Sequence, residues 1–193
     1  MMLKGIEIED KEINILPLSE SEIESMLQTL DNSREFERNK LLVLVLLYAG
    51  LDRDEVQNIK VTDIDFSKPS ITIEDREIPI PSSLSDRIKQ YLNDRKIQGV
   101  DSDYLFCCKY GNAYDKFAES NVNAVIKNTV KQMDIANERK KQIKVSSFKE
   151  SLIKRLFQVG FHIEEIVYLT GLSLASREKY ISLEDIGNRV NLN

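Results

Sequence analysis

The sequence predicts a mostly helical domain with a small antiparallel β-hairpin, an α+β fold. Apolar residues recur at helical spacing in several segments, and two of these segments begin with the pattern of a helix cap. Residues 71–80 instead alternate between apolar and polar side chains, as strands do. At 193 residues, 41% of them hydrophobic, the chain is long enough for one domain with a sizeable core.

Turn and cap residues set the limits of the expected helices in the first two thirds of the chain. Glu22 follows Ser19 by three residues, and Glu55 follows Asp52 in the same way, so both pairs fit capping boxes. Between them the run LLVLVLLYA ends at Gly50 and is apolar on nearly all sides, which predicts a central buried helix. The five expected helices cover about 19–30, 34–48, 52–59, 82–92 and 119–133.

The remaining segments complete the expected order of elements. ITIEDREIPI predicts a tight β-hairpin that turns at Glu74-Asp75. YLFCC is interpreted as a short apolar segment, KYGNAYDK as a loop, and the lysine-rich stretch before Val145 as a second loop. Residues 146–180 are expected to be helical. We divide the chain into a lead-in arm, one domain and a polar tail, which cover 1–17, 18–180 and 181–193.

Charge is distributed unevenly along the chain. The formal net charge is −5, and the acidic excess lies in the first hundred residues. Between Lys127 and Arg155, however, nine basic residues stand against three acidic ones. A dedicated DNA-binding domain is usually basic, so the total charge argues against tight, unaided DNA binding. The local excess of lysine still predicts a basic face, with Lys140, Lys141 and Lys144 as candidate DNA contacts, although a solvated surface explains such a run as well.

Several other classes of site and location are disfavoured. The only cysteines, Cys107 and Cys108, are adjacent, so we expect neither a disulfide nor a zinc site. His162 is the single histidine and is expected at a helix start, in a structural or exposed role. The longest apolar run has nine residues, too short to cross a bilayer, and the N-terminus lacks a signal-peptide core. We therefore expect no metal, no membrane contact and a cytoplasmic location.

The order of landmarks resembles the catalytic domain of the tyrosine recombinase (phage integrase) family. The landmarks are LPLSESEIESML, LLVLVLLYAGLDRDEVQNIKVTDIDF, REIPIPSSL, DYLF and GFHIEEIVYLTG followed by SLASREKY. The resemblance covers about residues 16–180. It lacks the N-terminal DNA-clamping domain that usually precedes this one in the family.

The resemblance implies a particular chemistry that needs no metal or other cofactor. In this family a tyrosine attacks the scissile phosphate and forms a covalent link. Two arginines hold the phosphate oxygens, and a lysine on the hairpin protonates the leaving hydroxyl. A histidine, together with a second histidine or a tryptophan, supports proton transfer. The resemblance places the nucleophile at Tyr180.

The sequence departs from this pattern at nearly every other position. Asp52 occupies the position of the first arginine, with Arg53 one residue further on. No lysine lies in the hairpin between Ser70 and Arg76. The substitutes at the other three positions are Ser146 for a histidine, Lys149 for the second arginine and Leu172 for the histidine or tryptophan. Lys149 keeps a charge but lacks the bidentate fork of arginine, so we name it only as a candidate phosphate contact.

Three hypotheses follow for the function. The first is a recombinase-like domain that has lost strand cleavage and binds DNA weakly or with assistance, as a homo-oligomer or beside an active recombinase. In that case residues 181–193 could be exchanged between protomers. The second is an active, divergent integrase that uses Tyr180, with Lys149 and either Arg53 or Arg76 as substitutes. The third is a helical protein–protein interaction domain without DNA chemistry, which the acidic first half favours.

Overall fold

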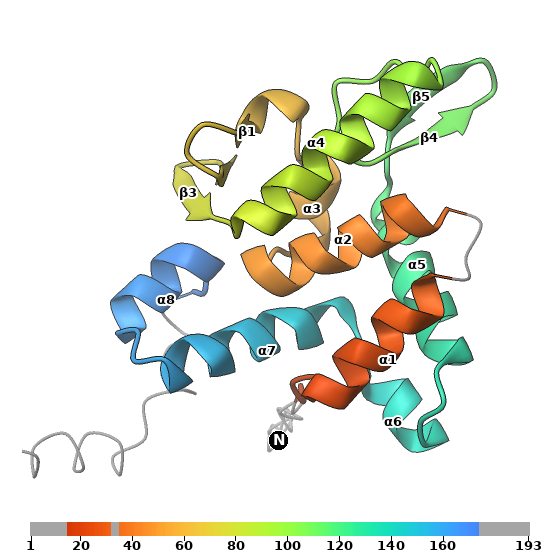
Figure 1. Cartoon of the computed structure of the whole chain (residues 1–193). Coiled ribbons are helices and arrows are strands. Elements are labelled where there is room, and N and C mark those ends of the chain that lie inside the picture. The colour runs from red at the N-terminus through yellow and green to blue at the C-terminus, as the bar shows by residue number, and fades with distance from the viewer. Residues whose placement is uncertain (1–14, 32–34, 174–193) are drawn as a thin grey trace, which may run out of the picture.

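The computed structural model describes residues 15–31 and 35–173. Helices dominate this part of the chain (Figure 1). They are α1 (Glu20–Leu30), α2 (Phe36–Ala49), α3 (Arg53–Asn58), α4 (Ser82–Ile97), α5 (Glu119–Gln132), α6 (Asn137–Gln142), α7 (Val145–Gln158) and α8 (Ile163–Thr170). The strands are β1 (Ile64–Asp65), β2 (Ser70–Ile73), β3 (Arg76–Pro79), β4 (Cys107–Tyr110) and β5 (Ala113–Lys116), and one 3₁₀ turn covers Val61–Asp63.

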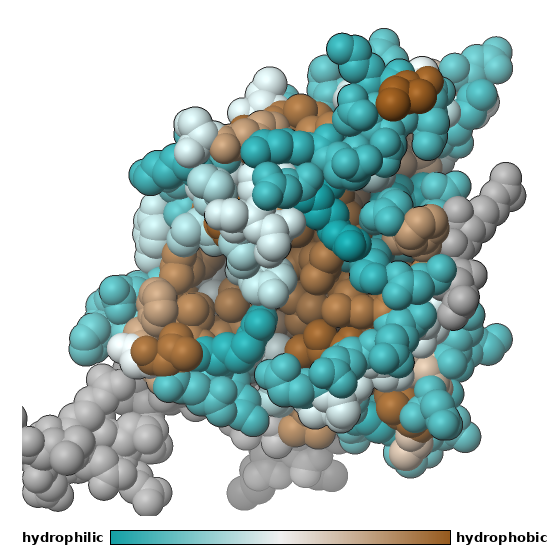
Figure 2. Space-filling model, viewed as in Figure 1, coloured by the Kyte–Doolittle hydropathy of each residue, from teal (hydrophilic) through white to brown (hydrophobic). Residues whose placement is uncertain are grey.

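Helix α2 forms the centre of the core. It packs against α1, α4 and α7, and Figure 1 shows it between α4 on one side and α7 on the other. Its side chains Leu41, Leu42, Val43, Val45 and Leu46 are fully buried, as the apolar run predicted. Figure 2 shows hydrophilic side chains over most of this face of the molecule, and a hydrophobic area near the middle, where α2 lies.

The predicted caps are present at three helix ends. Ser19 Oγ accepts a hydrogen bond from the Glu22 amide at 3.2 Å, and the Ser19 amide donates to the Glu22 carboxylate at 2.8 Å. At α3 the Asp52 amide donates to the Glu55 carboxylate at 2.7 Å. Gly50 ends α2 with a φ of +61°, a left-handed conformation that L side chains rarely adopt. These local signals therefore placed α1, α2 and α3 correctly.

The predicted hairpin is confirmed and belongs to a three-stranded sheet. Strands β2 and β3 pair antiparallel, with Ile71 opposite Ile78 and Ile73 opposite Arg76. The strand β1 adds to the other side of β2, which gives the order β1-β2-β3. Helix α8 contacts β3, so the sheet lies next to the end of the described chain.

Three segments differ from the expectations. The stretch 107–116, interpreted as an apolar segment and a loop, is a second hairpin, in which β4 and β5 turn at Gly111-Asn112. Gly111 has a φ of +61°, which a two-residue hairpin turn requires. The lysine-rich loop contains the helix α6, and α4 continues to Ile97, beyond its expected end at Leu92. Within residues 15–31 and 35–173, no helix has both the length and the apolar character needed to cross a membrane.

Candidate functional site

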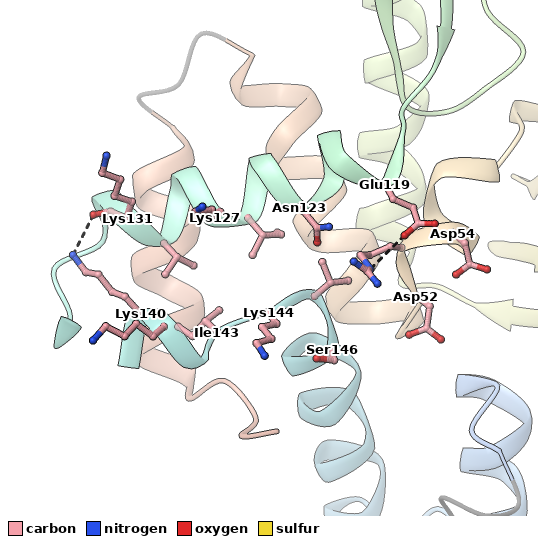
Figure 3. A pocket seen from close by; sticks show the side chains of 15 residues that line it. Asp52, Asp54, Glu119, Asn123, Lys127, Lys131, Lys140, Ile143, Lys144 and Ser146 are labelled. Atoms are coloured by element: carbon pink, nitrogen blue, oxygen red, sulfur yellow. Dashed lines mark hydrogen bonds and ion pairs between the residues drawn. The ribbon is translucent and has the colours of Figure 1, made fainter. Parts of the chain in front are cut away.

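A groove with a volume of about 790 Å³ lies where α5, α6, the start of α7 and the start of α3 meet (Figure 3). Its lining includes the three lysines that the sequence marked as candidate DNA contacts. The basic residues along it are Arg53, Lys127, Lys131, Lys140, Lys141 and Lys144. These come from four separate segments, so the fold gathers onto one surface the lysines that the sequence only placed near one another.

The groove has an aliphatic floor beneath the charged rim. Ile126 and Val130 of α5 face Ile143 and Val145, and all four side chains are almost fully buried. The alkyl stems of the lysines can lie over such a floor while their ammonium groups stay in water. The arrangement presents positive charge on a fixed, apolar base.

The two ends of the groove carry opposite charge. Lys131 and Lys140 lie at the α5–α6 end, and Asp52, Asp54 and Glu119 lie at the α3 end (Figure 3). Lys141 follows Lys140 in α6 and also lines the groove. At the acidic end Arg53 Nε lies 3.7 Å from Glu119 Oε2, and both side chains are about half exposed. An anion would therefore meet favourable potential at the lysine end and repulsion at the other.

The two lysines of α6 make exposed contacts with residues that the structure describes. Lys140 Nζ donates to the Lys131 carbonyl at 3.1 Å, and Lys141 Nζ lies 2.7 Å from Glu138 Oε1. An exposed ion pair such as Lys141–Glu138 contributes roughly 0–1 kcal/mol, so a phosphate can replace the glutamate at little cost.

Arg139 holds the lysine-bearing helix α6 against the N-terminal end of α1. Its Nε donates to Glu22 Oε1 at 2.6 Å, and its Nη2 donates to Glu22 Oε2 at 2.9 Å and to the Pro17 carbonyl at 2.7 Å. The hydrogen bond from Arg139 holds the pKa of the Glu22 carboxyl below its ordinary value of 4.5. This bidentate pair fixes where Lys140 and Lys141 stand relative to α5.

Lys149 of α7 pairs with Asp52 at the acidic end of the groove. Lys149 Nζ donates to Asp52 Oδ2 at 2.6 Å, and the lysine side chain is only 12% exposed. Asp52 lines the groove, and so does Ser146, which lies one helical turn before Lys149 in α7. The structure thus brings together three of the positions at which the resemblance expects phosphate-handling groups, and two of them neutralise each other.

The two arginines proposed as substitutes each pair with a carboxylate of the chain. Arg53 is the partner of Glu119 described above. Arg76 is buried, forms an ion pair with Glu55 and donates from Nη1 to the Leu169 carbonyl at 3.1 Å. Its guanidinium carbon lies 3.0 Å from where a Cβ on Gly171 would be. Arg76 therefore ties β3, α3 and the end of α8 together.

The other predicted residues are placed as follows. His162 is exposed and precedes α8 as its cap, as expected for a residue at a helix start. Cys107 is buried at the start of β4, and burial raises the pKa of its thiol. Leu172 is half-buried, and Tyr180 and the tail lie outside the described residues. In the part of the chain that is described, no three His, Cys, Asp or Glu side chains are grouped as a metal ion would need.

Comparison with known proteins adds a family match. The model of the phage integrase family matches residues 17–183. Tyrosine recombinase XerA of Pyrococcus furiosus is 30% identical over 172 residues, which are 84% of this chain and 56% of that protein. XerA of Pyrococcus horikoshii is 33% identical over 124 residues, which are 61% of this chain and 41% of that protein. The chain thus spans about half the length of these curated relatives.

Solved structures share the fold. A crystal structure of XerA recombinase aligns with a TM-score of 0.72 at 23% identity, covering 90% of this chain and 63% of that one. The Tn1549 transposon integrase in complex with transposon right end DNA aligns with a TM-score of 0.74 at 16% identity, covering 96% of this chain and 67% of that one. At these identities the alignments show a common architecture, and it is the mostly helical one with small antiparallel sheets that the sequence predicted.

Proposed function

Because the chain belongs to the phage integrase family, we propose that it binds duplex DNA in the service of DNA recombination or integration. We further propose that its strand-cleaving activity is lost or strongly reduced, so that it acts as a pseudoenzyme. The observation that carries the first part is the convergence of the lysines on one groove. The observation that carries the second is the ion pair between Lys149 and Asp52.

The lysine end of the groove supplies the DNA contacts in this proposal. These contacts come from α5, α6 and the turn between α6 and α7, and they are spread along the groove rather than around one point. The residues are Lys127, Lys131, Lys140, Lys141 and Lys144. That spacing suits a row of backbone phosphates, which the ammonium groups bind with release of counterions. The formal net charge of −5 opposes the approach of DNA, so the binding is expected to be weak or assisted by a partner.

The cleavage chemistry lacks its anion-holding groups. A phosphate needs fixed donors as charge develops on its oxygens, and removing one such donor commonly lowers the rate by about a hundredfold or more. Here Asp52 stands at the position of the first arginine and Lys149 at that of the second. The Asp52 carboxylate accepts a hydrogen bond from the Lys149 ammonium group. The Arg76 guanidinium is already bonded to Glu55 and to a carbonyl. Tyr180 would thus be a nucleophile without the groups that activate it.

A partner would complete this function. We propose that the chain acts as a homo-oligomer or beside an active recombinase, with residues 181–193 as the exchanged segment. The membership of the chain in the phage integrase family supports this view. We propose the same division of the chain as from the sequence, with a lead-in arm at 1–17 and one domain at 18–180.

Binding to a fluorescent duplex at several salt concentrations tests the DNA contacts. The triple variant Lys140→Gln, Lys141→Gln, Lys144→Gln should bind more weakly than the parent chain. The logarithm of the binding constant falls linearly with the logarithm of the salt concentration, and the steepness of this line should decrease by about 0.9 for each phosphate that the variant no longer neutralises. The control variant Lys68→Gln, Lys89→Gln, Lys96→Gln removes the same charge from the β1–β2 turn and α4, outside the groove. Equal slopes for the two variants, or no binding by the parent chain at low salt, would refute the proposal and favour the protein–protein interaction domain.

A further inference from the structure

The N-terminal segment leaves the described structure directly beside the lysine end of the groove. The Pro17 carbonyl accepts a hydrogen bond from Arg139 Nη2 at 2.7 Å, and the Leu18 amide donates to Ser151 Oγ at 2.7 Å. Arg139 belongs to α6 and is followed at once by Lys140 and Lys141, which line the groove. The chain is therefore anchored between α6 and α7 just after residues 1–14.

Residues 7–12 are complementary to the lysine end of the groove in charge and pattern. The segment 1–14 reads MMLKGIEIEDKEIN, with carboxylates at Glu7, Glu9, Asp10 and Glu12, which outnumber the ammonium groups of Lys4 and Lys11. Ile6 and Ile8 alternate with the first two of these. The lysine end of the groove has ammonium groups that could pair with these carboxylates. Its aliphatic side chains, from α5 and from the α6–α7 segment, could contact the isoleucines. Carboxylates and phosphates compete for the same ammonium groups.

The geometry of the tether favours this segment over an acidic partner in solution. Fourteen extended residues reach up to about 45 Å. The Pro17 carbonyl is hydrogen-bonded to Arg139, the residue before Lys140, so the segment starts close to the lysine end and is long enough to lie along it. A short tether gives a local concentration of the order of millimolar, so even weak contacts would be occupied within one molecule.

We propose that residues 1–14 dock on the lysine end of the groove and compete there with DNA phosphates. The N-terminal segment then limits the DNA affinity of its own chain, and a partner or a second binding surface must displace it. The competition rests on the proposed function, since it needs the groove to bind DNA, whereas the docking does not.

Zero-length carbodiimide cross-linking of the full chain tests the docking without DNA. The reagent joins a carboxylate to an ammonium group that touches it, and peptide mass spectrometry of the monomer band locates the link. Links are expected between residues 7–12 and Lys131, Lys140, Lys141 or Lys144. The pair Lys149–Asp52, whose atoms lie 2.6 Å apart, is the internal positive control. If that control link forms and the expected links are missing, or occur only in a dimer band, the docking within one chain is wrong.

Duplex binding by charge variants tests the competition. The variant Glu7→Gln, Glu9→Gln, Asp10→Asn, Glu12→Gln should bind DNA more tightly, by about tenfold, the size of a typical coupling between two sites. The same change in the background Lys140→Gln, Lys141→Gln, Lys144→Gln should give no such gain. The matched control Glu74→Gln, Asp75→Asn, Asp86→Asn, Asp94→Asn removes four carboxylates from the β2–β3 turn and α4.

The outcomes separate this inference from the proposed function. Equal gains for the arm variant and the control would show a net-charge effect alone and would overturn the competition. Binding that depends on the groove lysines but not on the arm would leave the proposed function standing and remove the inference. If no variant binds DNA at low salt, the proposed function and the competition both fail, and the cross-links alone decide the docking.

Discussion

Lys149 Nζ lies 2.6 Å from Asp52 Oδ2, and these residues occupy the positions at which the family resemblance expects two phosphate-binding arginines. The pair joins the start of α3 to α7 across the acidic end of the groove. An internal ion pair thus lies where the family resemblance expects a site for an external anion. A phosphate at Lys149 would compete with the Asp52 carboxylate for the ammonium group.

Asp52→Asn should raise the affinity for duplex DNA. The change leaves the Lys149 ammonium group without its carboxylate partner, so the group becomes available to a phosphate. The log–log slope of affinity against salt should then steepen by about 0.9, the value for one additional neutralised phosphate. Fluorescence anisotropy over a salt series measures both quantities.

Asp54→Asn is the matched control for that experiment. It removes the same charge from the same end of the groove and leaves the Lys149–Asp52 pair in place. Equal effects of the two variants would mean that only net charge matters and that Lys149 is not released. The double variant Asp52→Asn, Lys149→Gln should show no gain in affinity.

Glu22→Gln should destabilise the chain in a pH-dependent way. Because Arg139 holds the pKa of Glu22 below 4.5, the carboxylate contributes stability that is fully present above the pKa of the unfolded chain. That contribution is lost as the pH falls through the lower pKa of the folded chain. Urea unfolding from about pH 7 to about pH 3 should show a gap between parent and variant that narrows only in the acidic part of this range.

Glu24→Gln, on the same helix and without the Arg139 contact, controls for the loss of a carboxylate from α1. The pH dependence assigned to the Arg139 pair is wrong if both variants differ from the parent chain by the same amount at every pH. Added salt should reduce the difference in unfolding free energy between the parent chain and Glu22→Gln only partly, because both side chains of the pair are less than one fifth exposed.

Gly50→Ala should be more destabilising than Gly99→Ala. Both glycines have a positive φ, so each alanine meets the left-handed cost of roughly 1–2 kcal/mol. A Cβ at Gly50 would also lie 2.7 Å from Leu152 Cδ2, whereas a Cβ at Gly99 meets nothing within 4 Å. Overpacking of this kind typically costs about 1–3 kcal/mol more. Denaturant midpoints of the two variants measure the difference, and equal midpoints would show that Leu152 yields freely.

The sequence predicted the elements that have strong local signals. Ser19 and Asp52 each stand at a helix start with glutamate three residues later, Gly50 permits a left-handed helix end, and Glu74-Asp75 joins two alternating strands. Helix α6 could not be predicted in this way, because its six residues include no buried side chain and so show no apolar period. The second hairpin did carry a signal, since Gly111-Asn112 is a two-residue turn pair. The interpretation of YLFCC as an apolar segment and of KYGNAYDK as a loop did not use that signal.

The site was only partly predictable. The sequence marked Lys140, Lys141, Lys144 and Lys149 one by one, and the resemblance aligned Asp52 with the first arginine. Nothing in the order of residues shows that Lys149 and Asp52 would pair, since they are 97 positions apart and meet only because α3 and α7 converge. The Arg139–Glu22 contact joins residues 117 positions apart and is equally invisible in the sequence. Long-range charge pairing is set by tertiary packing, for which a single sequence holds no local signal.

DNA binding without DNA cleavage is the decisive property of the proposed function, and a suicide duplex with a nick near the cleavage site probes it. Such a substrate traps a covalent tyrosine–phosphate adduct, because the cleaved fragment diffuses away before it can be rejoined. We expect duplex binding with no adduct on a denaturing gel, either for the parent chain or for Tyr180→Phe. An adduct that forms with the parent chain and disappears in Tyr180→Phe would refute the loss of cleavage and would establish the active, divergent integrase.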